Sequence, residues 1–185
     1  MNILYLHGFA SYFDPNASKV KELSSIGTVY GFDIDYTQSP DDNIIKAQKF
    51  IKEKNNDIDL IVGCSLGGWL ATKISEITRI PFVALNPSVY PNMSLYSYQG
   101  KGIDYRNKPY ELSDVTIKRY TRMSTKGNGL IFLNKGDEVL NAKFIYDEVK
   151  GFYPVFMFKG GDHRFSNIKD VLPFIQGLRS IIKFG

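Results

Sequence analysis

The sequence predicts an α/β fold with a mostly parallel sheet of six to seven strands and helices on both faces. Short apolar runs typical of strands recur along the chain, and stretches with helical periodicity lie between most of them. Strands that alternate with helices indicate crossover connections and therefore a parallel sheet. The strand-like runs cover residues 2–6, 28–34, 58–63, 81–86, 129–134 and 153–158.

The predicted helices follow these strands in chain order. Residues 17–26 place Val20 and Leu23 three positions apart, which is the spacing of one helix face. Residues 41–54 carry apolar residues at the same kind of spacing. Further helices are expected at 66–78, 140–150 and 167–182.

Residues 87–126 interrupt the alternation and are too long for an ordinary connection. This segment holds six of the 12 tyrosines together with scattered Gly and Pro, and Ser113-Asp114 could open a short helix within it. We interpret it as a lid-like excursion across the mouth of the site. The whole chain, residues 1–185, is then a single domain.

The composition, with 43% hydrophobic and 23% charged residues, is that of a soluble globular protein. No apolar run approaches the length of a membrane span, and the first residues lack the cationic start of a signal peptide. Cys64 is the only cysteine, so no internal disulfide can form. We therefore expect a cytoplasmic protein without a membrane partner.

The net charge of +4 comes entirely from residues 87–126, which hold seven basic and three acidic residues. A nucleic-acid-binding protein usually carries a denser basic stripe, so we expect no nucleic-acid partner. Two interpretations of the basic segment stay open. It is a solvated lid surface, or it attracts an anionic substrate or partner.

The most informative motif is Gly63-Cys64-Ser65-Leu66-Gly67, which ends a strand-like run and leads into a predicted helix. A serine at such a tight turn is raised out of the backbone, where its hydroxyl can attack a carbonyl carbon. Ser65 is therefore the candidate nucleophile, and the alternative is a serine that merely terminates a strand. Cys64 is expected to point away from the apex of the turn as a small buried side chain.

The base that deprotonates such a serine must be His7 or His163, because the chain has two histidines. His163 lies just past the last predicted strand, in a glycine-containing loop, and the base is expected late in the order Ser, Asp, His. We therefore assign the base to His163. His7 is expected to buttress its own loop through its ring nitrogens.

The acid that orients the histidine is expected after the penultimate strand. Asp137 lies at that place, directly after a glycine, and Glu138 is its rival. Asp162 is a poor candidate because residues adjacent in sequence rarely face one another in the required geometry. A helix-capping role for Asp137 is the remaining alternative.

Oxyanion donors in such a site are backbone N–H groups. One should come from Leu66, which follows the nucleophile at a helix N-terminus. The second should come from the loop after the first strand, with Phe9 or Ala10 as candidates. An ordinary polar turn is the alternative for that loop.

No metal or cofactor site is expected. The two histidines and single cysteine are too widely separated for a usual zinc set. The glycine motifs that bind nucleotide phosphates or dinucleotides are absent from the sequence.

Five segments spread along the chain resemble the small single-domain bacterial esterases of the YqiA/YcfP type, within the α/β-hydrolase superfamily. The resemblance implies an α/β-hydrolase fold, activity on short acyl esters or thioesters, and a triad of Ser65, Asp137 and His163. It also implies that Asn86 and Pro87 line the pocket floor. The matching segments are Tyr5-Leu6-His7-Gly8-Phe9, Gly63-Cys64-Ser65-Leu66-Gly67-Gly68, Leu85-Asn86-Pro87-Ser88, Gly136-Asp137-Glu138-Val139-Leu140 and Gly160-Gly161-Asp162-His163-Arg164-Phe165.

The sequence therefore predicts a serine esterase or thioesterase that acts on small acyl substrates without a cofactor. Two alternatives from other classes stay open. One is a binding protein whose triad is vestigial, and the other is a peptidase or acyltransferase that uses the same triad.

Overall fold

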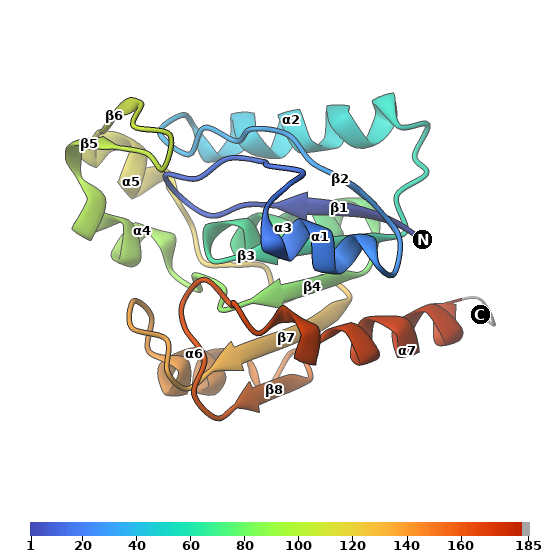
Figure 1. Ribbon diagram of the computed structural model, residues 1–185. Helices are drawn as coiled ribbons and strands as arrows, with labels where there is room; N and C mark the ends of the chain where they lie inside the picture. The colour runs from blue at the N-terminus through green and yellow to red at the C-terminus, as the bar shows by residue number, and fades with distance from the viewer. Residues whose placement is uncertain (183–185) are drawn as a thin grey trace.

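A computed structural model describes residues 1–182, with side chains through residue 178. Its main sheet has six strands in the order β2-β1-β3-β4-β7-β8, and every neighbouring pair is parallel, which confirms the predicted α/β sheet (Figure 1). The strands are β1 (Asn2–Leu6), β2 (Thr28–Tyr30), β3 (Leu60–Cys64), β4 (Phe82–Leu85), β7 (Gly129–Asn134) and β8 (Val155–Phe158).

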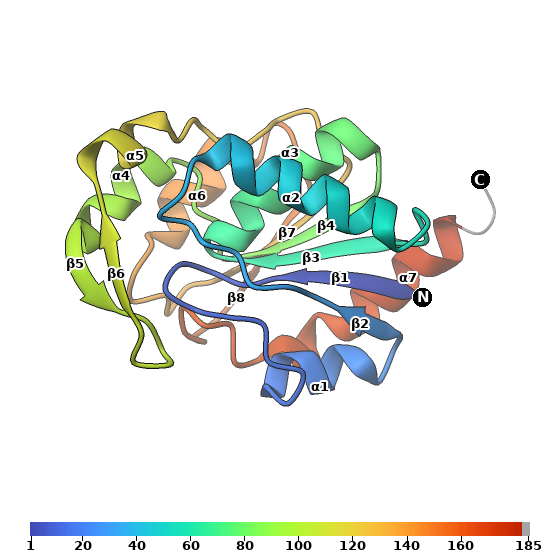
Figure 2. The ribbon, with the colours of Figure 1, turned by 90° about the horizontal axis from the view of Figure 1, so that it is seen from above.

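Helices cover both faces of this sheet (Figure 2). One face packs against α1 (Ser18–Ser24), η2 (Ile168–Asp170) and α7 (Leu172–Ile182). The other face packs against α2 (Pro40–Glu53), α3 (Leu66–Thr78) and α6 (Ala142–Val149).

Burial of both faces explains why the strands appear in the sequence as continuous apolar runs. In β1, Leu4 belongs to the core on the α3 side, whereas Ile3 and Tyr5 belong to the core on the α1 side. In β7, Ile131 and Phe132 divide between the two cores in the same way. Successive side chains of a strand point to opposite faces, so each strand contributes to both cores.

Local capping groups set the starts of the helices. The Ser39 hydroxyl accepts a hydrogen bond from the Asp41 N–H at the start of α2, where Pro40 occupies the first position. The Asn141 side chain does the same for the Phe144 N–H at the start of α6. These caps place α2 one residue earlier, and α6 two residues later, than the apolar spacing predicted.

Most of the segment 87–126 lies beyond the carboxyl ends of the strands, to which the arrows in Figure 1 point, and its last residues run back along α3, where Ser124 and Lys126 contact Glu76. Several hydrogen bonds fasten it to the body. Among them, the Tyr120 hydroxyl donates to Tyr36 O (2.9 Å) and the Trp69 indole N–H donates to Thr121 O (2.9 Å). Its elements are α4 (Pro91–Ser94), η1 (Leu95–Tyr98), the antiparallel strands β5 (Gly100–Ile103) and β6 (Pro109–Leu112), and α5 (Asp114–Arg119). We call residues 87–126 the lid.

Most basic side chains of the lid pair with carboxylates, several of which lie outside the lid. Arg106 pairs with Asp33, and Arg122 pairs with Glu148. The remaining pairs are Arg106–Asp104, Lys118–Asp114, Arg119–Asp41 and Lys126–Glu76. This pairing neutralises much of the charge excess that the sequence concentrates in this segment.

Within residues 1–182, no helix combines the length and apolarity that crossing a bilayer requires.

Candidate active site

Ser65 occupies a sharp turn between β3 and α3, with φ 55° and ψ −119°. A positive φ is unfavourable for a residue with a side chain, so neighbouring groups must hold it. The Ser65 N–H donates to Leu85 O (2.9 Å), and its carbonyl oxygen accepts from the N–H groups of Gly68 (2.9 Å) and Ser88 (3.2 Å). The backbone of Ser65 is therefore fixed from three sides.

Two glycines permit the close approaches that this turn requires. A Cβ atom at Gly63 would lie 2.1 Å from Gly67 O, and one at Gly67 would lie 2.1 Å from Leu6 O. Both distances are impossible for a real side chain, and the obstructing atoms belong to the backbone. Only glycine fits at these two positions, which explains why a glycine lies two residues before and two residues after Ser65.

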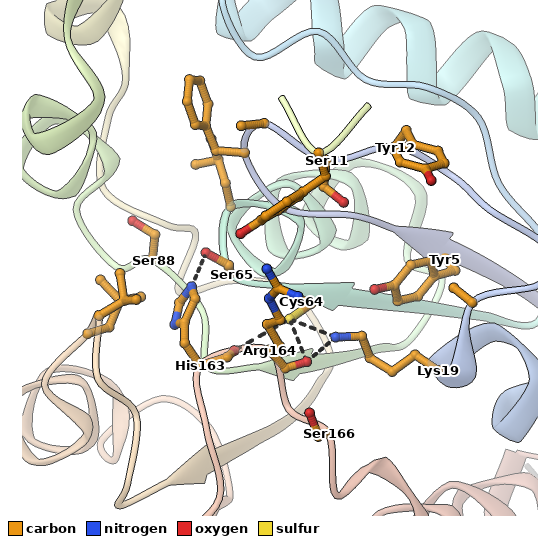
Figure 3. A pocket seen from close by; sticks show the side chains of 18 of the residues that line it. Tyr5, Ser11, Tyr12, Lys19, Cys64, Ser65, Ser88, His163, Arg164 and Ser166 are labelled. Carbon is orange, nitrogen blue, oxygen red and sulfur yellow. Dashed lines mark hydrogen bonds between the residues drawn. The ribbon is translucent and has the colours of Figure 1, made fainter. Parts of the chain in front are cut away.

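A hydrogen-bonded chain joins Ser65, His163 and Asp137, and Figure 3 shows its Ser65–His163 part. His163 Nε2 lies 2.9 Å from Ser65 Oγ, and His163 Nδ1 lies 2.9 Å and 3.0 Å from the two carboxylate oxygens of Asp137. With the ring proton on Nδ1 donated to Asp137, Nε2 is free to accept from the Ser65 hydroxyl. The structure therefore brings together the three residues that the sequence analysis selected.

The carboxylate of Asp137 is nearly inaccessible, with 1% of its side chain exposed. One of its oxygens also accepts hydrogen bonds from the N–H groups of Val139 (2.8 Å) and Leu140 (2.7 Å). Glu138, its rival in the sequence, instead accepts from the backbone N–H of His163 (2.9 Å). Asp137 thus contacts the ring, whereas Glu138 holds the loop that carries it.

Asn86 and Pro87 do not line the cavity above Ser65, so the expectation that they form its floor is wrong. The Asn86 side chain is fully buried, and its amide donates to the carbonyl oxygens of Asp162 (2.9 Å) and His163 (3.2 Å). Pro87 packs against Gly68 in the first turn of α3. Asn86 therefore anchors the His163 loop from below, a role that the sequence analysis missed.

The two expected oxyanion donors, Phe9 and Leu66, both line the cavity. Within residues 1–182, neither backbone N–H donates to a protein acceptor, so both stay available to a ligand. The loop of Phe9 passes directly beside the serine, because a Cβ atom at Gly8 would lie 3.2 Å from Ser65 Cβ. Ala10, the alternative donor, follows in the same loop with φ 52°.

His7 takes no part in this chain of bonds and instead fixes the loop after β1. Its Nε2 accepts from the Ile34 N–H (2.9 Å), so its proton lies on Nδ1, which donates to Gly8 O (2.8 Å). Burial lowers the pKa of His7, against an opposing effect of the hydrogen bond to Gly8. His7 therefore remains neutral and buttresses the loop that carries Phe9, as its position in the sequence indicates.

A cavity of about 380 Å³ opens above Ser65. Its lining includes the apolar side chains of Leu95 and Leu140, the ring of Tyr98, and two cationic residues, Lys19 and Arg164. Cys64, the last residue of β3, also lines this cavity. It is 6% exposed, and burial raises the pKa of its thiol. Within residues 1–182, no cluster of three or more His, Cys, Asp or Glu side chains could hold a metal ion.

A family model matches residues 2–180 of the chain. The chain belongs to UPF0227, an uncharacterised protein family. The UPF0227 protein YcfP of Escherichia coli (strain K12 / DH10B) is 28% identical over 185 residues, which span 97% of this chain and 99% of that protein.

Solved structures share the fold of this UPF0227 member at low sequence identity. Est1E from Butyrivibrio proteoclasticus with bound ferulic acid has a TM-score of 0.72 at 13% identity, covering 95% of this chain and 88% of that one. The monoacylglycerol lipase of Paleococcus ferrophilus has a TM-score of 0.63 at 16% identity, covering 88% and 85%. The α/β hydrolase domain-containing protein 10 from mouse has a TM-score of 0.64 at 16% identity, covering 98% and 89%. The UPF0227 chain therefore has the α/β-hydrolase fold.

Proposed function

We propose that this protein is a serine esterase or thioesterase, with Ser65 as nucleophile, His163 as general base and acid, and Asp137 as the group that orients His163. The observation that carries the proposal is the unbroken chain of hydrogen bonds from Asp137 through His163 to Ser65. A positioned nucleophile, base and orienting acid are the recurring parts of acyl transfer by serine. The neighbouring cavity supplies room for a small acyl substrate.

In the first half of the reaction, Ser65 Oγ attacks the carbonyl carbon while its proton passes to His163 Nε2. Asp137, already bonded to Nδ1–H, stabilises the imidazolium ion that forms. The carbonyl oxygen becomes an oxyanion and accepts hydrogen bonds from the N–H groups of Phe9 and Leu66. Collapse of this intermediate breaks the bond to the leaving group, which takes the proton from His163 and leaves an acyl ester on Ser65.

In the second half, a water molecule takes the place of the alcohol or thiol. His163 Nε2 removes a proton from the water as its oxygen attacks the acyl carbon. The second tetrahedral intermediate collapses, the proton returns to Ser65 Oγ, and a carboxylic acid is released. Proteins of the same fold whose names state lipase or esterase activity support this choice of reaction.

A covalent label tests the proposal. A fluorophosphonate probe should label Ser65 in the folded wild-type protein, and Ser65→Ala should abolish labelling. The same variant should lower ester turnover by about 10⁴–10⁶-fold without loss of folding. Ser88→Ala is the matched control, because the Ser88 hydroxyl bonds to that of Ser94 and, among the described residues, forms no hydrogen bond with His163. A native protein that resists the probe and hydrolyses neither nitrophenyl esters nor thioesters would refute the assignment.

A further inference from the structure

Two cations line one side of the cavity beside Ser65. Lys19 lies in the first turn of α1, and its amine donates to the carbonyl oxygen of Arg164 and lies 3.8 Å from Cys64 Sγ. Arg164 follows His163 directly in the chain. In the view of Figure 3, Lys19 and Tyr5 extend toward Cys64 and Arg164 from one side, with His163 on the other.

The guanidinium of Arg164 is held by an aromatic ring and leaves its donors free. It lies over Tyr105 of the lid, 4.4 Å from the ring centroid. Within the described part of the chain, no protein group accepts a hydrogen bond from this guanidinium, and neither Lys19 nor Arg164 pairs with a carboxylate. A guanidinium is planar, so stacking its face on a ring leaves the N–H donors at its edge available to a ligand.

This isolation contrasts with the other cations near the site. Arg106 and Arg122 of the lid each pair with acidic side chains. Of the residues that line the cavity, one is a carboxylate, Asp14, and it accepts the N–H of Asn16. The lining of the cavity therefore carries one net positive charge, and within the described residues neither Lys19 nor Arg164 forms an ion pair.

Neutral donors add to this side of the cavity. The Tyr5 hydroxyl lines it, and burial raises the pKa of Tyr5, so the group stays a hydrogen-bond donor at neutral pH. Burial also raises the pKa of the Cys64 thiol, which favours its neutral form beside Lys19. Ser11 and Ser166 place further hydroxyl groups on the same lining.

We propose that Lys19 and Arg164 form an anion-binding subsite beside Ser65, and that the preferred substrates are esters or thioesters that carry a carboxylate. The inference rests on the proposed esterase function and defines its substrate class. Charge-assisted hydrogen bonds to a carboxylate are the strong ones, and a partly enclosed cavity strengthens them further. The carboxylate can reside on the acyl chain or on the leaving group, and separate substrates distinguish the two.

The test uses two matched pairs of substrates with the full-length protein. For the acyl side, para-nitrophenyl adipate monoester is compared with para-nitrophenyl hexanoate. For the leaving-group side, meta-carboxyphenyl butyrate is compared with its methyl ester. The measured quantity is the ratio of kcat/KM for the anionic substrate to kcat/KM for its neutral partner, so a general loss of activity cancels.

The wild-type ratio should exceed about 10 for one pair and should fall as ionic strength rises. Lys19→Gln and Arg164→Gln should each lower that ratio by about 10-fold or more. Lys21→Gln removes the same charge from an exposed position two residues along α1, and it should leave the ratio unchanged.

The outcomes separate this inference from the proposed function. Hydrolysis of the neutral esters with a wild-type ratio near one for both pairs overturns the anion subsite and leaves the esterase intact. A high ratio that survives both substitutions also overturns it. Loss of both hydrolysis and Ser65 labelling would remove the proposed function itself, and the inference with it.

Discussion

Ser65 adopts a backbone conformation that costs about 1–3 kcal/mol for a residue with a side chain, and it persists because its surroundings leave no alternative. The glycines at positions 63 and 67 allow the sheet, the turn and α3 to approach within distances that no Cβ atom permits. Hydrogen bonds from Gly68 and Ser88 then hold the Ser65 carbonyl. This turn places the Ser65 hydroxyl 2.9 Å from His163 Nε2.

Asp137→Asn should lower kcat by about 10⁴-fold with little change in KM. An amide can donate to His163 Nδ1 and so favours the tautomer that carries its proton on Nε2, where it can no longer accept from Ser65. Steady-state kinetics with a nitrophenyl ester measures the effect. Glu138→Gln is the control, because its side chain keeps an oxygen for the His163 N–H, and it should cost less than about 10-fold. A larger loss in Glu138→Gln than in Asp137→Asn would contradict the assignment of roles.

The sequence located Ser65, Asp137 and His163 because each lies within a few residues of the end of a strand-like run, and parallel strands bring such ends to one edge of the sheet. It misplaced Asn86, which also follows a strand but turns into the protein to bind the His163 loop. The direction of a side chain at a strand end depends on its three-dimensional neighbours. The spacing of residues along the chain does not indicate which neighbours these are.

The lid hairpin formed by β5 and β6 is fastened to the loops at the carboxyl end of the sheet. Arg106 lies in the hairpin turn, and its guanidinium forms an ion pair with the carboxylate of Asp33, after β2 (N–O distance 2.5 Å). The guanidinium carbon also lies over Tyr12, 4.6 Å from the ring centroid. The adjacent Tyr105 N–H donates to Ala10 O (3.0 Å). The hairpin is thereby connected to the loop that carries Phe9, so its position and that of the expected oxyanion donor are linked.

Arg106→Gln should loosen this connection without unfolding the protein. Hydrogen exchange of the Tyr105 amide should accelerate by about two- to fivefold. A partly exposed ion pair contributes little to the stability of the fold, but the Arg106–Asp33 pair is adjacent to the hydrogen bond from Tyr105 N–H to Ala10 O. Lys108→Gln removes a charge from the same hairpin, and no ion pair of the Lys108 side chain occurs within residues 1–182. Equal acceleration in both variants would show that charge in general, rather than the Asp33 contact, holds the hairpin.

At the same scale, the sequence predicted the type of each main element better than its ends. The run 28–34 yields a strand over Thr28–Tyr30, after which the chain leaves the sheet. We interpreted residues 87–126 as an excursion but did not predict the hairpin within them. Gly100 and Gly102 in β5, and the polar turn that follows β5, give no alternating apolar pattern. Burial patterns mark strands inside a sheet, whereas a hairpin at the surface carries no such mark.

At the scale of the whole molecule, the loops at the strand ends connect the active site to the hydrophobic cores on the two faces of the sheet. β1 is buried on both faces, and at its end His7 links the loop of Gly8 and Phe9 to Ile34, after β2. The His7 side chain is 1% exposed and can keep both of its hydrogen bonds in the neutral form alone. A charged His7 would direct Nε2–H against the Ile34 N–H.

The stability of the fold should therefore depend on pH through His7. Its pKa is lowered by burial from the ordinary value of 6.5, so the unfolded chain binds a proton more readily. The contribution of neutral His7 to the free energy of unfolding is complete above pH 6.5. It is lost as the pH falls below this value, by up to about 1.4 kcal/mol per pH unit. Urea titrations between pH 7.5 and about 5 measure the slope. His7→Asn should flatten it, whereas His163→Gln, which removes the other histidine, should keep it. Equal slopes in His7→Asn and wild type would disprove the role of His7.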